Sequence, residues 1–229
     1  MIIGALQKTS LIDYPGEIAA VIFTQGCNFR CPYCHNPELV DRKQFTTPLD
    51  NNEVLAFLHH RQGLLDGVVV TGGEPTIHKD LPEFLRKIKQ MGYLIKLDTN
   101  GTNPAMIRKV TDLNLVDYIA MDYKAPLGKY ADVVRAEVNI HHIIDTMETI
   151  KNSGVKYEFR TTIVKELLSA DDIQTIRHEI GSGEKYCIQE FNPTKTLDES
   201  FLKCSTFSPQ VLKDIQDTKQ KHFKIELIR

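Results

Sequence analysis

Apolar and polar positions follow two alternating patterns along the chain. Six short apolar segments rich in β-branched residues have the length of buried strands. These segments are residues 18–24, 67–72, 93–99, 116–122, 157–164 and 186–191. Six others show the apolar spacing of amphipathic helices, namely 50–61, 80–90, 103–111, 139–152, 170–180 and 208–219. Strands and helices therefore alternate, and residues 222–228 are a candidate for one further strand.

This alternation predicts an α/β fold built on a parallel sheet. Strands that are joined through helices form parallel sheets with right-handed crossovers. Six such units are fewer than the eight of a closed barrel. We therefore predict an incomplete (β/α)6 parallel barrel that is open on one side. No linker or low-complexity segment divides the sequence, so we expect residues 1–229 to form a single domain.

Composition narrows the class of protein without changing this fold. The chain has 41% apolar residues, 25% charged residues and a formal net charge of -2, which give no sign of nucleic-acid binding. No apolar run approaches the roughly 18 residues of a membrane helix, and the first residues lack the features of a signal peptide. We therefore expect a cytoplasmic protein. Five cysteines, three of them close together, favour reduced metal-binding thiols over a disulfide framework.

Unusual residues follow five of the predicted strands. A cysteine-rich loop, residues 25–37, follows the first strand, and Gly72-Gly73-Glu74-Pro75 follows the second. Residues 98–101, Asp122-Tyr123-Lys124 and Asn192-Pro193 follow the third, fourth and sixth. Because the carboxyl ends of barrel strands meet at one rim, where barrel enzymes have their active sites, we expect these loops to face one shared pocket.

The loop at residues 25–37 holds Cys27, Cys31 and Cys34 at C-x3-C-x2-C spacing. Three thiolates on a short loop can bind three irons of a 4Fe-4S cluster. The fourth iron is then open to a substrate or cofactor. A zinc site that includes His35 is an alternative by ligand type, although adjacent Cys34 and His35 are poorly placed to bind one tetrahedral ion.

The two remaining cysteines leave a second alternative open. In that interpretation, Cys187 or Cys204 completes a conventional electron-transfer cluster. Otherwise Cys187, which lies inside an apolar strand, is a small core residue and Cys204 is an incidental thiol.

The cysteine spacing, the aromatic Tyr33 before the last cysteine and Gly72-Gly73-Glu74-Pro75 together resemble the radical S-adenosylmethionine (SAM) superfamily. Three further stretches resemble its activating enzymes of glycyl radical enzymes, those of anaerobic ribonucleotide reductase and pyruvate formate-lyase. They are Cys34-His35-Asn36-Pro37, Leu97-Asp98-Thr99-Asn100-Gly101 and Asp122-x-Lys124. Residues 6–16, LQKTSLIDYPG, are most similar to anaerobic ribonucleoside-triphosphate reductase activating proteins. The resemblance covers nearly the whole chain and is weakest after about residue 195.

The resemblance implies a radical SAM partial barrel whose three loop cysteines hold a catalytic 4Fe-4S cluster. S-adenosyl-L-methionine is then expected at the open iron, bound through its amino and carboxylate groups. The resemblance assigns the amino group to Gly72, Gly73 and Glu74, because glycine lets the backbone approach a ligand closely and a carboxylate accepts hydrogen bonds from an ammonium. It assigns the carboxylate to Lys124, which can neutralise that charge.

The resemblance also implies a monovalent-cation site beside the cofactor. Its ligands are expected to be Asp98, Thr99 and Asp122 with the backbone carbonyl of Ala120, since hard oxygen ligands suit such an ion. Alternatively, Asp98 and Thr99 only shape a turn with residues 100–101.

Three other side chains are candidates for the pocket. Tyr33 is expected near the adenine, although core packing is a fair alternative. Asn192 is expected to contact the ribose through its amide. Arg160 either points into the pocket or pairs with Glu158, two residues away on the same strand face.

The resemblance predicts an oxidoreductase of anaerobic metabolism, an activase that makes a glycyl radical on a partner enzyme. A flavodoxin or ferredoxin is the expected electron donor, and no nucleic-acid or membrane partner is expected. A small radical SAM enzyme acting on a small molecule or peptide, such as a carboxy-deazaguanine synthase, is the alternative, although those synthases tend to modify the regular cysteine spacing. A non-catalytic iron-sulfur electron carrier explains the cysteines but not the other loops.

Overall fold

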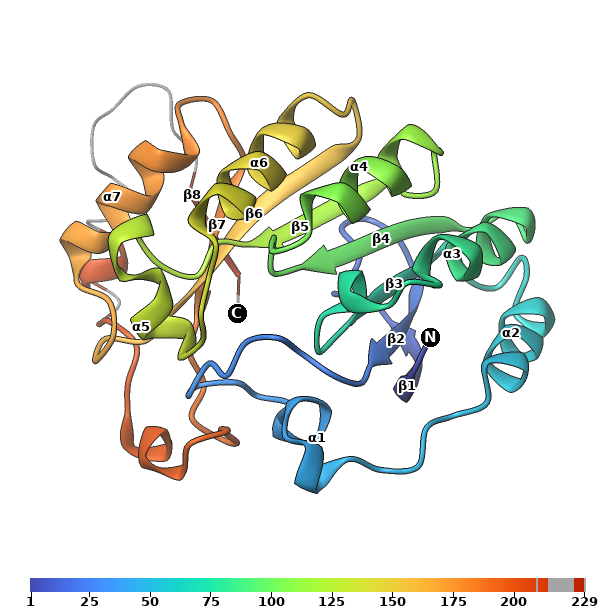
Figure 1. Ribbon diagram of the computed structural model, residues 1–229, viewed down its shortest axis with the longest axis horizontal. Coiled ribbons are helices and arrows are strands. Elements are labelled where there is room, and N and C mark those ends of the chain that lie inside the picture. The colour runs from blue at the N-terminus through green and yellow to red at the C-terminus, as the bar shows by residue number, and fades with distance from the viewer. Residues whose placement is uncertain (209, 214–224, 229) are drawn as a thin grey trace.

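The computed structural model describes residues 1–208, 210–213 and 225–228. Within these residues, eight strands form one sheet in the order β1 to β8 (Figure 1). Strands β2 to β8 run parallel to one another, and β1 runs antiparallel to β2. The two outer strands, β1 and β8, each pair with one neighbour only, so the described sheet is an open barrel. The predicted α/β fold with an incomplete parallel barrel is confirmed.

The strands match the predicted apolar segments closely. Their bounds are Ile3–Ser10 (β1), Ala19–Thr24 (β2), Gly67–Gly72 (β3), Leu94–Thr99 (β4), Tyr118–Asp122 (β5), Lys156–Ile163 (β6), Tyr186–Glu190 (β7) and Ile225–Ile228 (β8). Each of the six predicted strands begins and ends within two residues of an observed strand. The further strand expected near the end of the chain is β8. The sequence did not predict β1, an edge strand in which half of the residues are polar and most are at least partly exposed.

Most of the helices cover one face of this sheet, whereas the short first helix lies apart from them, beyond the loop that follows β2 (Figure 1). They are Pro37–Val40 (α1), Asn51–His60 (α2), Leu81–Gln90 (α3), Pro104–Asp112 (α4), Tyr130–Val134 (α5), Ile140–Lys151 (α6) and Ala170–Ile180 (α7). Five predicted helices agree with α2, α3, α4, α6 and α7 to within one residue, whereas the short α1 and α5 were not predicted. Of the predicted helix 208–219, residues 210–213 are helical and residues 209 and 214–219 lie outside the described residues.

The two faces of the sheet have different surroundings. Strand residues such as Ile22, Leu97 and Phe159 belong to the large core that includes the apolar faces of the helices. The alternate residues face the barrel interior, where Val69 and Tyr118 form a small second core with Tyr14. The Tyr14 and Tyr118 ring centroids lie 6.0 Å apart. This second core fills the end of the barrel where the parallel strands begin, so the polar interior positions lie nearer the strands' carboxyl ends.

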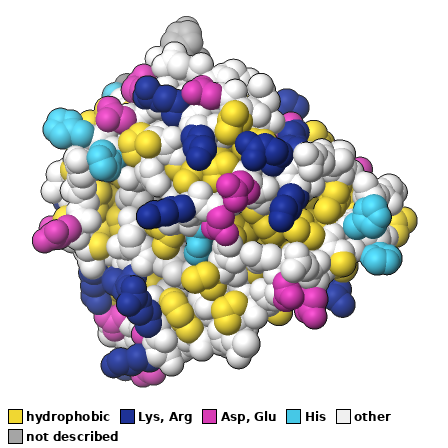
Figure 2. Space-filling view, turned by 45° about the vertical axis from the view of Figure 1, so that its right-hand side comes forward, with side chains coloured by type: hydrophobic (Ala, Val, Ile, Leu, Met, Phe, Trp, Pro, Cys, Tyr) yellow, Lys and Arg dark blue, Asp and Glu magenta, His cyan; other side chains and the backbone are white. Residues whose placement is uncertain are grey.

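The surface carries charges of both signs. On the face seen in Figure 2, basic and acidic side chains are interspersed among apolar ones. Within the described residues, every helix is too short or too polar to cross a membrane.

Candidate active site

A cavity of about 240 Å³ lies at the carboxyl ends of the parallel strands, against the cysteine loop. Its lining includes most of the predicted site residues: Cys27, Cys31, Tyr33, Cys34, Gly72, Gly73, Glu74, Asp98, Thr99, Asp122 and Lys124. Four of the five loops that we predict to share one pocket therefore line it, whereas the loop at Asn192-Pro193 does not. The segment that joins β2 to α1 lies across these strand ends (Figure 1).

The structure places two predicted site residues away from the cavity lining. Ala120 lies inside β5, paired with Asp98 on β4 and Glu158 on β6. Asn192 is exposed, and the amide that lines the cavity belongs to Gln189 instead.

Sequence reasoning missed Gln189 and Thr162, which line the cavity from β7 and β6. The hydroxyl of Thr162 donates to Oε1 of Gln189 at 3.5 Å. The period of two along a strand was the signal that could have found them, because Thr162 follows Arg160 on the same face of β6.

The three loop thiols lie in surroundings that disfavour their charged form. Burial raises the pKa of Cys27 to about 12, and the Glu74 carboxylate acts in the same direction. Burial also raises the pKa of Cys31 to about 11 and shifts that of Cys34 upward. The backbone N–H of Phe29 donates to Sγ of Cys27 at 3.4 Å. Buried thiols of this kind become thiolates when a metal group replaces their protons, as an iron-sulfur cluster does.

The described cysteines are not arranged as a zinc site. Within the described residues, no group of three or more His, Cys, Asp or Glu side chains is placed to hold a metal ion. Tetrahedral zinc needs ligands that converge on one point, whereas the cysteines of a cubane cluster bind different irons and lie farther apart. The ring of His35, the fourth ligand of the zinc alternative, packs against Phe191 with centroids 5.5 Å apart.

The remote cysteines lie outside the cavity lining. Cys187 is buried in β7, where its thiol donates to Oε2 of Glu158 at 3.7 Å. Cys204 follows the 3-10 helix Glu199–Lys203. Neither position supports the alternative in which a fourth cysteine completes the cluster.

The glycine pair after β3 packs against the cysteine loop. The N–H of Gly73 donates to the carbonyl of Thr24 at 2.8 Å, and the N–H of Glu74 donates to that of Gly26 at 2.8 Å. A Cβ added to Gly73 would lie 2.0 Å from the Gly26 carbonyl oxygen, and one added to Gly72, with φ +112°, 2.4 Å from the Thr24 nitrogen. The close approach that the glycines permit is therefore between two segments of this chain, where we had expected an approach to the ligand.

Glu74 joins the loops that follow β3 and β4. The residue as a whole is 1% exposed. Oε1 accepts the Thr76 N–H at 3.0 Å, the Thr76 hydroxyl, and the Thr99 hydroxyl at 2.9 Å. Oε2 accepts the Asn100 N–H at 2.6 Å. Burial raises the pKa of Glu74, although these hydrogen bonds oppose the shift. Because Oε2 has one donor among the described residues, it can accept a second from a ligand.

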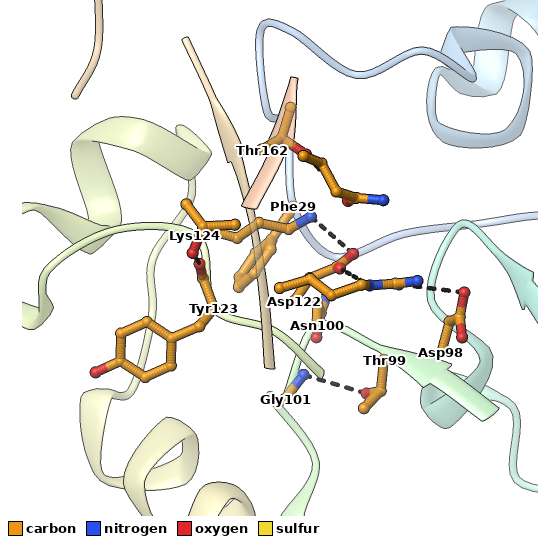
Figure 3. Close-up of polar contacts among 12 residues, drawn as sticks. Phe29, Asp98, Thr99, Asn100, Gly101, Asp122, Tyr123, Lys124 and Thr162 are labelled. Atoms are coloured by element: carbon orange, nitrogen blue, oxygen red, sulfur yellow. Dashed lines mark hydrogen bonds and ion pairs between the residues drawn. The ribbon is translucent and has the colours of Figure 1, made fainter. Parts of the chain in front are cut away.

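Asn100, which the sequence indicated only as a turn residue, connects that turn to the cysteine loop. Its side-chain amide donates to Oδ1 of Asn28 at 2.8 Å and lies 4.0 Å from Sγ of Cys27. The Gly101 N–H donates to the Thr99 hydroxyl at 3.1 Å within the turn (Figure 3). Hydrogen bonds therefore connect the loops after β2, β3 and β4 into one rim.

A row of five alternating charges crosses the barrel interior. Lys96 Nζ lies 2.7 Å from Asp98 Oδ1, and Arg160 joins Asp98 Oδ2 at 3.1 Å to Asp122 Oδ1 at 3.0 Å. Lys124 Nζ lies 2.9 Å from Asp122 Oδ2 and ends the row at the cavity (Figure 3). We call these five residues the charged row. Three cations and two carboxylates leave it with a net charge of one positive unit.

The charged row decides between the two interpretations of Arg160. Arg160 points into the interior and pairs with the two aspartates. Glu158 has other partners, since it accepts the Tyr118 hydroxyl at 2.7 Å and pairs with Lys185 at 3.1 Å. Burial alone would raise the pKa of Asp122, but Arg160 and Lys124 outweigh it and hold that pKa at about 2.

The predicted monovalent-cation ligands do not fit a bound ion in this arrangement. All four carboxylate oxygens of Asp98 and Asp122 lie beside nitrogen cations of the charged row. The Thr99 hydroxyl is hydrogen bonded to Glu74 and to the Gly101 N–H. Ala120 lies in a central strand with neighbours on both sides, where the ladder uses backbone carbonyls.

The sequence matches the Radical SAM superfamily over residues 21–178. A Methanocaldococcus jannaschii protein named as a glycyl-radical enzyme activating enzyme is 33% identical over 234 aligned residues, covering 100% of this chain and 95% of that protein. The pyruvate formate-lyase-activating enzyme of Clostridium pasteurianum is 29% identical, covering 80% of this chain and 84% of that enzyme. The 7-carboxy-7-deazaguanine synthase of Aquifex aeolicus is 36% identical but covers only 38% of each chain.

Among solved structures, a radical SAM methyltransferase from Sphaerobacter thermophilus has a similar fold. The TM-score is 0.71 at 16% identity, covering 96% of this chain and 68% of the methyltransferase. At that identity the similarity supports the open-barrel fold alone.

Proposed function

Because the chain belongs to the radical SAM superfamily, whose members use a 4Fe-4S cluster and SAM, we propose that it generates a glycyl radical on a partner enzyme. One observation carries the proposal: similarity to an activating enzyme extends over the whole of this chain. When bound, the cluster and SAM would supply a 5'-deoxyadenosyl radical by one-electron cleavage of SAM, with methionine as the other product, and that radical would take a hydrogen atom from a glycine Cα of the partner.

The cysteine loop is proposed to hold the cluster through Cys27, Cys31 and Cys34. These thiols line the cavity, so the open iron would face the space where SAM binds. The hydrogen bond from the Phe29 N–H and the proximity of the Asn100 amide give Cys27 partial stabilisation as a thiolate. The cysteine loop thus supplies the metal ligands and one polar neighbour, the Phe29 N–H, while the loop after β4 supplies the other.

Lys124 is proposed to bind the SAM carboxylate. Its ammonium ends the charged row at the cavity, and the row has one excess positive charge. A single carboxylate would neutralise that excess in a largely buried setting, where a charge pair is strong. Asp122 and Arg160 hold the ammonium in place before the ligand arrives.

Gly72, Gly73 and Glu74 are proposed to bind the SAM amino group. Glu74 Oε2 can accept one further donor, and both glycines line the cavity. Tyr33, whose buried hydroxyl has no hydrogen-bond partner among the described residues, is proposed to lie near the adenine. A ribose contact by Asn192 stays a prediction, and Gln189 is better placed for it.

The partner is proposed to be a glycyl radical enzyme whose glycine-bearing segment enters through the open side of the barrel. A flavodoxin or ferredoxin is proposed as the electron donor. A single domain over residues 1–229 and a cytoplasmic location stay predictions.

Anaerobic reconstitution tests this function. The protein is loaded with iron and sulfide, reduced, and examined by electron paramagnetic resonance with and without SAM, and 5'-deoxyadenosine is measured. A candidate glycyl radical enzyme is then added, and the expected result is its glycyl radical doublet. Cofactor cleavage without that doublet for any candidate would favour a small-molecule substrate, and no cleavage would indicate an electron carrier.

The alternative of carboxy-deazaguanine chemistry has one observation in its favour. The Aquifex aeolicus synthase shares 36% identity over 89 residues, although this is 38% of the chain. The assay with a pterin substrate in place of the partner enzyme separates the two functions.

A further inference from the structure

The charged row already contains the positive charges that a bound alkali ion would bring. We propose that Lys96 and Arg160 act as built-in cations, so that SAM binds at this site without K⁺ or Na⁺. The inference rests on the proposed binding of SAM in the cavity, and it concerns the ionic support of that site.

Asp98 lies between two fixed cations. Lys96 Nζ approaches Oδ1 at 2.7 Å, and an Arg160 terminal nitrogen approaches Oδ2 at 3.1 Å. Lys96 is 2% exposed and comes from the same strand, two residues before Asp98. The strand itself therefore holds the Lys96 ammonium against the Asp98 carboxylate. An ion from the solvent has no such covalent attachment.

Asp122 is paired in the same way from β6 and from its own loop. Arg160 Nε approaches Oδ1 at 3.0 Å and Lys124 Nζ approaches Oδ2 at 2.9 Å. The planar guanidinium spans the two aspartates in one fixed geometry. An alkali ion placed between Asp98 and Asp122 would have to displace this group and would lie beside its charge, which is unfavourable at such short range.

Lys96 is the residue whose removal should reopen an ion site. Substitution by methionine keeps most of the length of the side chain, frees Oδ1 of Asp98 and lowers the net charge of the charged row from one positive unit to zero. A monovalent cation bound to Oδ1 of Asp98 would then replace the lost ammonium and return the net charge of the charged row to one positive unit, which favours binding of the SAM carboxylate. In this view Lys96 and Arg160 are positioning residues that act through the two aspartates.

The test measures SAM affinity of the cluster-loaded protein by equilibrium dialysis in KCl, NaCl and tetramethylammonium chloride at equal ionic strength. The native protein is expected to bind equally in all three. Lys96→Met is expected to bind about fivefold or more tightly in KCl or NaCl than in tetramethylammonium chloride, the range of ordinary coupling between two ligands. Lys89→Met is the matched control, because Lys89 pairs with Asp117 at the same 2.7 Å outside the cavity.

A second readout needs neither cluster nor SAM. The thermal midpoint of the cluster-free native protein is expected to be unchanged by the cation, whereas that of Lys96→Met rises by about 3 °C in KCl. Should Lys96→Met fail to fold, the SAM affinity and thermal midpoint of the native protein in the three salts still test the inference. A native protein that requires K⁺ or Na⁺ for stability or SAM affinity overturns the inference, and so does a Lys96→Met protein indifferent to the cation. Failure to bind SAM in every salt would instead overturn the proposed function.

Discussion

The two sides of the cavity differ in whether the chain itself supplies partners for their charged groups. On the side of the cysteine loop, burial raises the pKa values of all three thiols, and the opposing effect of Lys124 on Cys31 and Cys34 is smaller than that of burial. On the side of the charged row, each aspartate oxygen already has a cationic partner. The thiols of the cysteine loop need a bound metal group to become thiolates. The charged row needs only one negative charge, placed beside Lys124, to become neutral.

This difference follows from where the residues stand in the fold. The thiols belong to an irregular loop, which can adjust to a cluster. The members of the charged row belong to β4, β5 and β6 or follow directly after β5, so the sheet fixes their spacing. The irregular cysteine loop therefore holds the metal ligands, and the sheet fixes the positions of the charges.

The largest effects are expected on the cysteine side. Alanine at Cys27, Cys31 or Cys34 should abolish cluster loading and SAM cleavage, because three thiolates are the minimum that holds the cluster. Cys187→Ala and Cys204→Ala, the matched controls, should load normally. Iron content, electron paramagnetic resonance and 5'-deoxyadenosine yield are the measurements. Loss of the cluster in either control would mean that a remote cysteine is a ligand and that the two sides are not as separate as described.

Lys124→Met changes the charged row where it meets the cavity. The variant should keep its cluster but bind SAM roughly 10- to 100-fold more weakly, since a charge-assisted hydrogen bond contributes about 1.5–3 kcal/mol. Lys129→Met is the control, because Lys129 pairs with Asp172 at 2.8 Å away from the cavity lining. Equilibrium dialysis measures the affinity. Unchanged affinity in Lys124→Met would place the SAM carboxylate elsewhere.

Much of the fold can be predicted from the sequence, and so can some residues on each side of the cavity. Strands buried on both faces produce apolar runs that are easy to find, as in β3. The edge strand β1 has a polar, exposed side and leaves no such run. Lys96 lies inside the apolar run of β4, so its role was not visible without knowing what faces it.

The charged row itself depends on the register between strands. Asp122 pairs with Arg160 across β5 and β6, and Asp98 pairs with Ala120 across β4 and β5. These partners are dozens of residues apart, and a single sequence does not reveal which positions become neighbours. The cysteine motif was recognisable because its ligands are close together in the chain.

Gly73→Ala tests how firmly the loop after β3 is fixed to the cysteine loop. The added Cβ would lie 2.0 Å from the Gly26 carbonyl, so the loops must separate, at a cost of about 2 kcal/mol in the free energy of unfolding. Gly128→Ala is the control, because nothing lies within 4 Å of its added Cβ. Urea unfolding of the cluster-free proteins gives the difference. Equal stabilities would mean that the glycine position is not constrained by this contact.

The smallest effect concerns the response of the charged row to acid. Arg160 and Lys124 hold the pKa of Asp122 at about 2, below its ordinary value of 3.8, so folding favours the ionised carboxylate. The stabilisation is complete above pH 5 and declines as the pH falls toward 2, by about 1 kcal/mol between pH 6 and pH 3. Asp122→Asn cannot titrate at this position, so its deficit relative to the native protein should be largest at pH 6 and shrink by that amount at pH 3. Urea unfolding of both cluster-free proteins at the two pH values measures the change. A deficit that stays constant with pH would show that Asp122 has the same pKa in the folded and unfolded chain, and that the charged row is held together by packing and not by its charges.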